Sequence, residues 1–60
     1  MYAITNKKTK ALDLVAHERM EGRTAKVFEN NAIYAVNIGQ AHPEFESVSE
    51  LRGDWVETDY

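Results

Sequence analysis

The first five positions, Met-Tyr-Ala-Ile-Thr, are mostly apolar, and the segment is followed at once by polar residues. Tyr2 and Ile4 fall on one face, and the Tyr, Ile and Thr of this segment favour extended backbone. The polar run over residues 6–8 is typical of a turn. The pattern predicts a short strand over residues 1–5.

In the next segment strict alternation fails at the adjacent apolar pairs 11–12 and 14–15. Apolar residues instead recur at spacings of three and four, which favours a helix over residues 9–21. Thr9 is the expected N-cap, and Gly22 stands where a helix end tolerates positive φ. A competing interpretation is a hairpin, with residues 6–10 as the turn and residues 11–16 as the return strand. The predicted apolar stripe of the helix consists of Ala11, Leu12, Val15, Ala16 and Met20.

Two segments rich in β-branched and aromatic residues, 24–28 and 32–38, flank the run Glu29-Asn30-Asn31. Asparagine is the non-glycine residue that best tolerates the left-handed backbone of tight turns. The pattern predicts a central antiparallel hairpin over about residues 24–38, ending at Gly39.

A second short helix is predicted over residues 43–52. Pro43 suits the first turn of a helix, and Gly53 is placed to end it. Between them, apolar residues recur every three positions, at Phe45, Val48 and Leu51.

A last short strand is expected around residues 55–58, from Trp55, Val56 and Thr58. The whole chain, residues 1–60, is then a small single domain of the α+β class: an antiparallel sheet with a central hairpin and one or two short helices. Strand order cannot be read from one sequence.

Length and composition narrow the class of protein. Cysteine is absent from the 60 residues, which excludes disulfides and thiolate metal sites and leaves self-association, such as a homodimer, as the other route to more buried area. With 43% hydrophobic residues the chain is too apolar for disorder, and no apolar run is long enough for a membrane span. The N-terminus lacks the order of charges of a secretory signal, so we expect a cytoplasmic protein without membrane contact.

Charge divides the chain into two parts. Residues 1–26 hold six bases and three acids, a net charge of +3, whereas residues 27–60 hold seven acids and one base, a net charge of −6. Trp is enriched at interface hot spots, and acidic groups steer association with a basic partner, so the end of the chain is a candidate protein-binding surface. Its residues are Glu44, Glu46, Glu50, Asp54, Trp55, Glu57 and Asp59. The competing interpretation places Trp55 in the core and makes the acids a solvated face. Taken residue by residue, we favour it both for Trp55 and for the acids.

A nucleic-acid-binding module is the first alternative. Its basic cluster is Lys7, Lys8 and Lys10, and its candidate stacking residues are Tyr2, Phe28 and Tyr34. We rank this function second because the acidic remainder of the chain repels a polyanion.

Metal and catalytic sites are not predicted. A helical zinc motif needs histidines at i and i+4, but Glu21 stands four residues after His17, and His42 belongs to a distant segment. We therefore interpret His17 and Glu21 as surface charges on the helix. The spacing places neither a base nor an oxyanion hole beside Ser47 or Ser49, so no catalytic residue and no cofactor is expected.

The leading hypothesis is a small, non-enzymatic protein-binding module that acts through its acidic C-terminal segment on a partner with a basic surface. In size and lack of cysteine the chain resembles the small accessory proteins of bacteria and their viruses, many of which act by binding another protein, some as inhibitors. A self-associating structural subunit is the second alternative.

Overall fold

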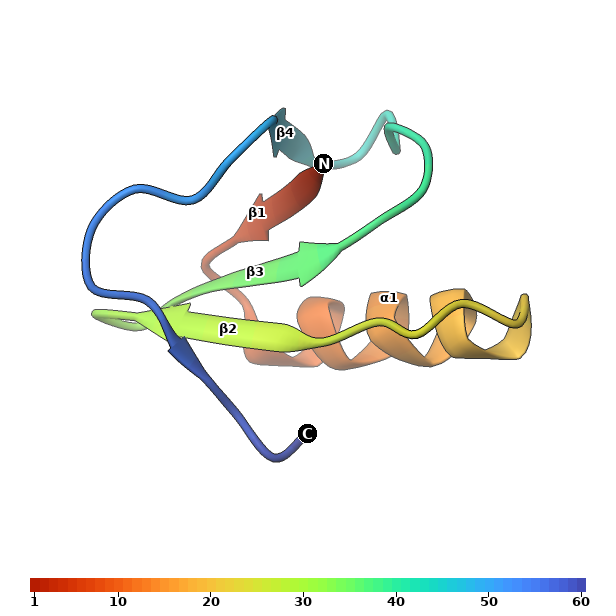
Figure 1. Ribbon diagram of the computed structural model, residues 1–60, viewed down its shortest axis with the longest axis horizontal. Helices are drawn as coiled ribbons and strands as arrows, with labels where there is room; N and C mark the ends of the chain where they lie inside the picture. The colour runs from red at the N-terminus through yellow and green to blue at the C-terminus, as the bar shows by residue number, and fades with distance from the viewer.

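The computed structural model describes residues 1–60 and contains one helix and a five-stranded antiparallel sheet. Its elements are β1 (Tyr2–Thr5), α1 (Lys8–Met20), β2 (Val27–Asn30), β3 (Ile33–Asn37), β4 (Glu46–Val48) and β5 (Val56–Glu57). The strand order is β4-β1-β3-β2-β5, so β3 lies between the two strands that α1 connects (Figure 1). The α+β class and the strand over residues 1–5 are confirmed.

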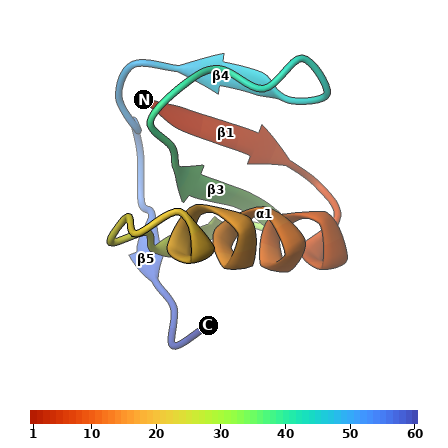
Figure 2. The same cartoon turned by 90° about the vertical axis from the view of Figure 1, so that its right-hand side faces the viewer.

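The helix covers one face of the sheet and leaves the other without a helix (Figure 2). Ala3, Val36 and Val27 are register partners across β1, β3 and β2, and all three are fully buried under α1. Because neighbouring residues of a strand point to opposite faces, Tyr2, Ile4 and Phe28 lie on the opposite side, which we call the helix-free face. As predicted, Tyr2 and Ile4 share a face.

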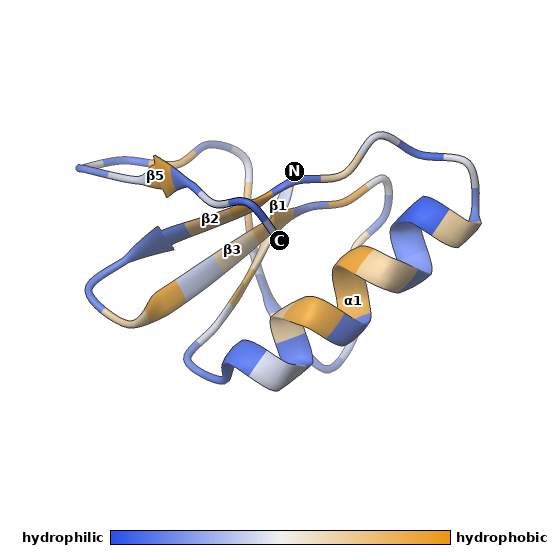
Figure 3. Cartoon of the chain, turned by 90° about the horizontal axis from the view of Figure 1, so that it is seen from below, coloured by the Kyte–Doolittle hydropathy of each residue, from blue (hydrophilic) through white to orange (hydrophobic).

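The core between α1 and the sheet is built from small side chains. Its largest fully buried members are Val27 and Val36, each contributing about 1.5–3 kcal/mol by leaving water. Hydropathy colouring shows the apolar residues in the middle of α1 and along β2 and β3 (Figure 3). The eight core residues are Ala3, Ala11, Leu14, Val15, Ala25, Val27, Val36 and Ile38.

The segment predicted as a helix over residues 9–21 is a helix, not a hairpin. The predicted N-cap is wrong, because α1 begins at Lys8 and Thr9 lies in its first turn. The hydroxyl of Thr5 instead accepts a hydrogen bond from the backbone N–H of Lys7, at 3.1 Å. Gly22 follows the helix with φ of +86°, as predicted. The helix is too short and too polar to cross a membrane.

The buried face of α1 differs from the apolar stripe predicted from the sequence by a rotation equivalent to one residue. The buried positions are Ala11, Leu14, Val15 and Glu18, whereas Met20 is 87% exposed. One residue corresponds to a rotation of about 100° around the helix axis. The prediction failed because the true buried stripe includes a charged residue, Glu18, which the apolar pattern could not select.

The predicted central hairpin is formed by β2 and β3, with strands confined to residues 27–37. Its turn consists of Asn31 and Ala32, at φ of 49° and 64°. Two left-handed residues between paired strands are typical of a type I′ turn, which matches the twist of the hairpin. The turn therefore lies later than predicted, and Glu29 and Asn30 belong to β2.

The predicted helix over residues 43–52 is wrong. Residues 46–48 form β4, which pairs with β1 so that Val48 lies opposite Tyr2. A helix of ten residues is marginal in isolation, whereas the edge of β1 offers unpaired backbone donors and acceptors. Residues 49–55 then cross from β4 at one edge of the sheet to β5 at the other (Figure 1). The last strand, β5, is confirmed at residues 56–57.

Candidate functional site

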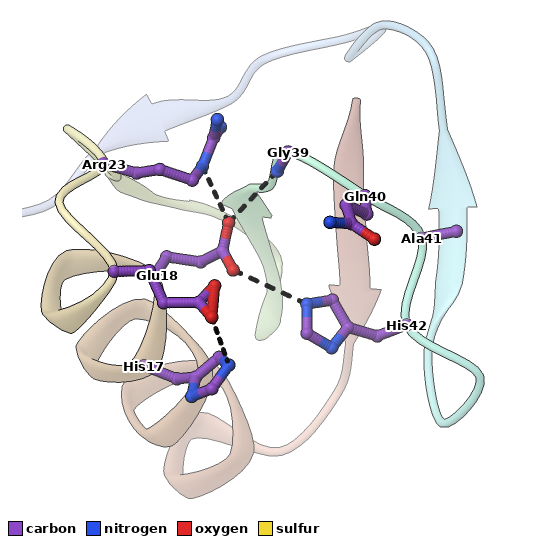
Figure 4. Close-up of a pocket in the computed structure, with 8 residues that line it drawn as sticks. His17, Glu18, Arg23, Gly39, Gln40, Ala41 and His42 are labelled. Atoms are coloured by element: carbon purple, nitrogen blue, oxygen red, sulfur yellow. Dashed lines mark hydrogen bonds and ion pairs between the residues drawn. The ribbon is translucent and has the colours of Figure 1, made fainter.

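Glu18 is the one buried charged residue of the protein. It lies beside a pocket of about 460 Å³ between the C-terminal half of α1 and the segment that follows β3 (Figure 4). We call this the Glu18 pocket. Its lining residues are His17, Glu18, Glu21, Arg23, Gly39, Gln40, Ala41 and His42.

Three groups contact the Glu18 carboxylate. Arg23 Nε lies 2.9 Å from Oε1, and the backbone N–H of Gly39 donates to the same oxygen at 3.1 Å. His42 Nε2 lies 3.6 Å from the other oxygen, Oε2 (Figure 4). Burial acts to raise the pKa of Glu18, but the Gly39 N–H, Arg23 and His42 together outweigh it and lower the pKa below its usual value. Glu18 is therefore ionised at neutral pH.

The end of α1 explains why Arg23 reaches Glu18. The N–H of Gly22 bonds to the carbonyl of Arg19, and the N–H of Arg23 bonds to the carbonyl of Glu18, at 3.0 and 3.1 Å. These two bonds with a left-handed Gly22 form a Schellman motif, which folds the chain back over the last turn. Gly39 allows the close approach, because a Cβ there would lie 2.7 Å from Arg23 Nη1.

Both histidines of the protein lie in the Glu18 pocket. His17 Nε2 is 3.6 Å from Glu21 Oε2, with 57% of each side chain exposed, which agrees with their interpretation as surface charges. His42, although it belongs to a distant segment of the sequence, packs edge to face with His17 at 6.1 Å between ring centroids. Histidines and carboxylates in one pocket are groups that can bind a divalent metal ion. The sequence contains the helical part of this group of ligands, since His17 is followed by glutamates one and four residues later.

A second site lies on the helix-free face. An apolar groove of about 560 Å³ runs between strand residues and the segment from β4 to β5. Trp55 lines it, half-buried and outside the core, with its indole N–H donating to the carbonyl of Arg52 at 2.9 Å. We call this site the Trp55 groove. Its lining residues are Ile4, Ile33, Glu46, Val48, Ser49, Glu50, Leu51, Arg52 and Trp55.

The acidic residues predicted to form one binding surface are divided among several places. Glu46 and Glu50 line the Trp55 groove together with Trp55. Glu57 lies on the same face, opposite Phe28 in the sheet register, and pairs with Lys26 at 3.5 Å. The remaining three lie elsewhere: Glu44 beside His17 and His42, Asp54 beside Glu29 and Asn31, and Asp59 exposed near the C-terminus.

The residues of the nucleic-acid alternative are also divided. Tyr2 and Phe28 pack edge to face at 6.0 Å on the helix-free face, whereas Tyr34 packs against the core under α1. At the start of α1, the ammonium of Lys8 lies 4.3 Å from the ring centroid of Tyr60. Lys7 and Lys10 line a hollow that also contains two carboxylates, Glu44 and Glu46. The three aromatic residues thus provide no single stacking face.

The fold and its sites define a small α+β protein with an ionised pocket beside the helix and an apolar groove on the helix-free face. Neither Ser47 nor Ser49 lines the pocket that holds the histidines. Comparisons with protein-family models, with curated proteins and with solved structures find no match to this chain. The chemistry of the two sites is accordingly what points to a function.

Proposed function

We propose that this chain is a small, non-enzymatic protein-binding module whose contact surface is the Trp55 groove. The observation that carries the proposal is the position of Trp55, half-buried on the helix-free face and outside the core. Its neighbours Ile33 and Val48 are 40% and 38% exposed, so the groove presents apolar side chains to solvent beside Trp55. An aromatic residue among exposed apolar side chains is typical of a hot spot.

The rim of the groove indicates the chemistry of the partner. Glu46 has no ion-pair partner, and Glu50 pairs only with exposed Arg52, at 3.3 Å. The net charge of −6 over residues 27–60 attracts a basic surface. We therefore expect a partner that inserts an apolar side chain beside Trp55 and places lysine or arginine against Glu46 and Glu50.

The test begins with proteins captured from cells of the source organism by the tagged chain and identified by mass spectrometry. Each captured protein is then purified and titrated against variants by calorimetry. Trp55→Ala should weaken binding about 30-fold or more, the effect of losing a hot-spot residue. Glu46→Lys should weaken it about 5-fold and reduce its dependence on salt. The matched control is Val56→Ala, because Val56 is the next residue, is apolar and 65% exposed, and does not line the groove.

Circular dichroism of each free variant separates binding from folding. If Trp55→Ala unfolds the free protein, Trp55 is a structural residue and the proposed anchor is wrong. Equal affinity of Trp55→Ala, Glu46→Lys and the control would place the contact elsewhere. Sedimentation of the free protein decides the remaining case, since a dimer that Trp55→Ala dissociates would make a second copy the occupant of the groove.

A further inference from the structure

The Glu18 pocket brings together four side chains whose donor atoms suit a transition metal. His17 and Glu18 come from the last turn of α1, Glu21 is the residue that caps its C-terminus, and His42 comes from the segment after β3. Each imidazole Nε2 faces a carboxylate oxygen at 3.6 Å, His17 with Glu21 and His42 with Glu18. These distances are longer than a hydrogen bond, so each imidazole nitrogen faces its carboxylate oxygen without a short contact between them. The space between these atoms is where an ion would bind.

The spacing of the donor atoms is close to that of a coordinated ion. Ligand atoms of His17, Glu18 and Glu21 all lie within 4.8 Å of one another. Donors around a tetrahedral zinc lie roughly 3.4 Å apart, so His17 and Glu21 must move toward Glu18 by about 1 Å. His17 and Glu21 have 57% of their side chains exposed and are free to make this movement. The imidazole centroids at 6.1 Å compare with about 5 Å for two histidines on one tetrahedral ion.

Glu18 is the fixed member of the cluster. Only 4% of its side chain is exposed, and Arg23 and Gly39 both hold Oε1. Oε2 is held by neither Arg23 nor Gly39 and faces His42 Nε2 at 3.6 Å, which leaves it able to bind a metal. Contacts of this kind orient a ligand and commonly change metal affinity 10–100-fold when they are removed.

Charge and ligand type restrict the ion. With neutral histidines, Glu18, Glu21 and Arg23 give the pocket a net charge of −1, which favours a cation despite the guanidinium. Two imidazoles with two carboxylates suit Zn²⁺, Co²⁺ or Ni²⁺, whereas Mg²⁺ and Ca²⁺ prefer oxygen ligands alone. We propose that His17, Glu18, Glu21 and His42 form a binding site for one divalent transition-metal ion, with Zn²⁺ as the best fit.

Calorimetric titration of the metal-stripped protein with ZnCl₂ tests the proposal. We expect one ion per chain with a Kd in the micromolar range, and no binding of MgCl₂ at the same concentrations. His17→Gln and His42→Gln should each weaken Zn²⁺ binding at least 10-fold, and Glu21→Gln should weaken it several-fold. The matched control is Glu50→Gln, because Glu50 is also an exposed carboxylate in a single ion pair but lies outside the pocket.

Two further measurements keep the test independent of stability changes in the variants. NMR spectra of the unmodified protein should show Zn²⁺-induced shifts of both imidazoles at the same molar ratio, and Co²⁺ should give the visible absorption of a tetrahedral complex. Binding that survives the combined substitution of His17 and His42, or shifts confined to one imidazole, would overturn the proposal and leave only ion pairs in the pocket.

Discussion

Replacing Glu18 with glutamine removes the charge of the one buried carboxylate and preserves the length of the side chain. The glutamine carbonyl can still accept the Gly39 N–H, which Glu18 Oε1 receives at 3.1 Å. Arg23, whose Nε lies 2.9 Å from the same oxygen, loses its ionic partner. The substitution therefore isolates the charge of Glu18 from its packing.

The contacts determine the expected magnitude. Removing one partner of a fully buried ion pair costs about 3–5 kcal/mol, and a hydrogen bond to a charged group contributes about 1.5–3 kcal/mol. Arg23 has 39% of its side chain exposed, so water can solvate its guanidinium when the carboxylate is lost. We therefore expect Glu18→Gln to lower the free energy of unfolding by about 2 kcal/mol, near the lower of these ranges. A domain of this length has roughly 3–9 kcal/mol in total, so the loss is large.

Urea denaturation followed by far-UV circular dichroism at pH 7 measures this loss. Glu21→Gln is the matched control, because Glu21 caps the C-terminus of the same helix in an exposed pair with His17, and its removal should cost less than about 0.5 kcal/mol. Equal losses for Glu18→Gln and Glu21→Gln would refute the reasoning, since the burial of Glu18 would then contribute nothing.

The pH dependence provides a second check with a definite sign. The pKa of Glu18 in the folded protein lies below its ordinary value of 4.5. A carboxylate whose pKa falls on folding contributes stability that is complete above the unfolded pKa and is lost as pH falls through the folded pKa. The difference in stability between the unmodified protein and Glu18→Gln should thus be constant above about pH 5 and shrink at lower pH. A difference that persists undiminished in acid would contradict an ionised Glu18.

The remaining predictions concern the hairpin turn, the helix and the two proposed sites. Ala32→Gly should raise the free energy of unfolding by about 0.5–1 kcal/mol, because Ala32 is left-handed at φ of 64°; an unchanged urea midpoint would contradict this strain. Met20→Gln should change stability by less than about 0.5 kcal/mol, whereas Leu14→Ala should cost about 2–5 kcal/mol, because Leu14 faces the core. Trp55→Ala should abolish most partner binding without unfolding the chain. Glutamine at His17 or His42 should weaken Zn²⁺ binding at least 10-fold.

Sequence patterns predicted those parts of the fold that depend on interactions between residues close together in the chain. The hairpin follows from β-favouring residues around a left-handed asparagine, and the end of α1 follows from Gly22. The rotation of α1 could not be predicted in this way, because apolar residues are available on two adjacent stripes. Glu18 can lie on the buried face of α1 because Arg23, Gly39 and His42, which lie outside the helix, contact its carboxylate.

For the candidate sites, too, the sequence supplied the residues and the tertiary structure supplied their arrangement. The sequence identified Trp55, Glu46 and Glu50 as candidate contacts, but it could not show that residues 46–55 place them beside Ile4 and Ile33. That neighbourhood exists because residues 46–48 pair with β1 instead of forming the predicted helix.

By itself, the sequence determined the α+β class, the first strand, the helix, the hairpin and the division of charge between the two halves of the chain. Each depends on interactions between residues close in sequence, or on composition alone. Only the tertiary structure decided that residues 46–48 join the sheet, that Trp55 stays outside the core, and that His42 meets His17 and Glu18. These outcomes depend on backbone groups and side chains that lie more than twenty residues apart, and no local pattern records such pairings.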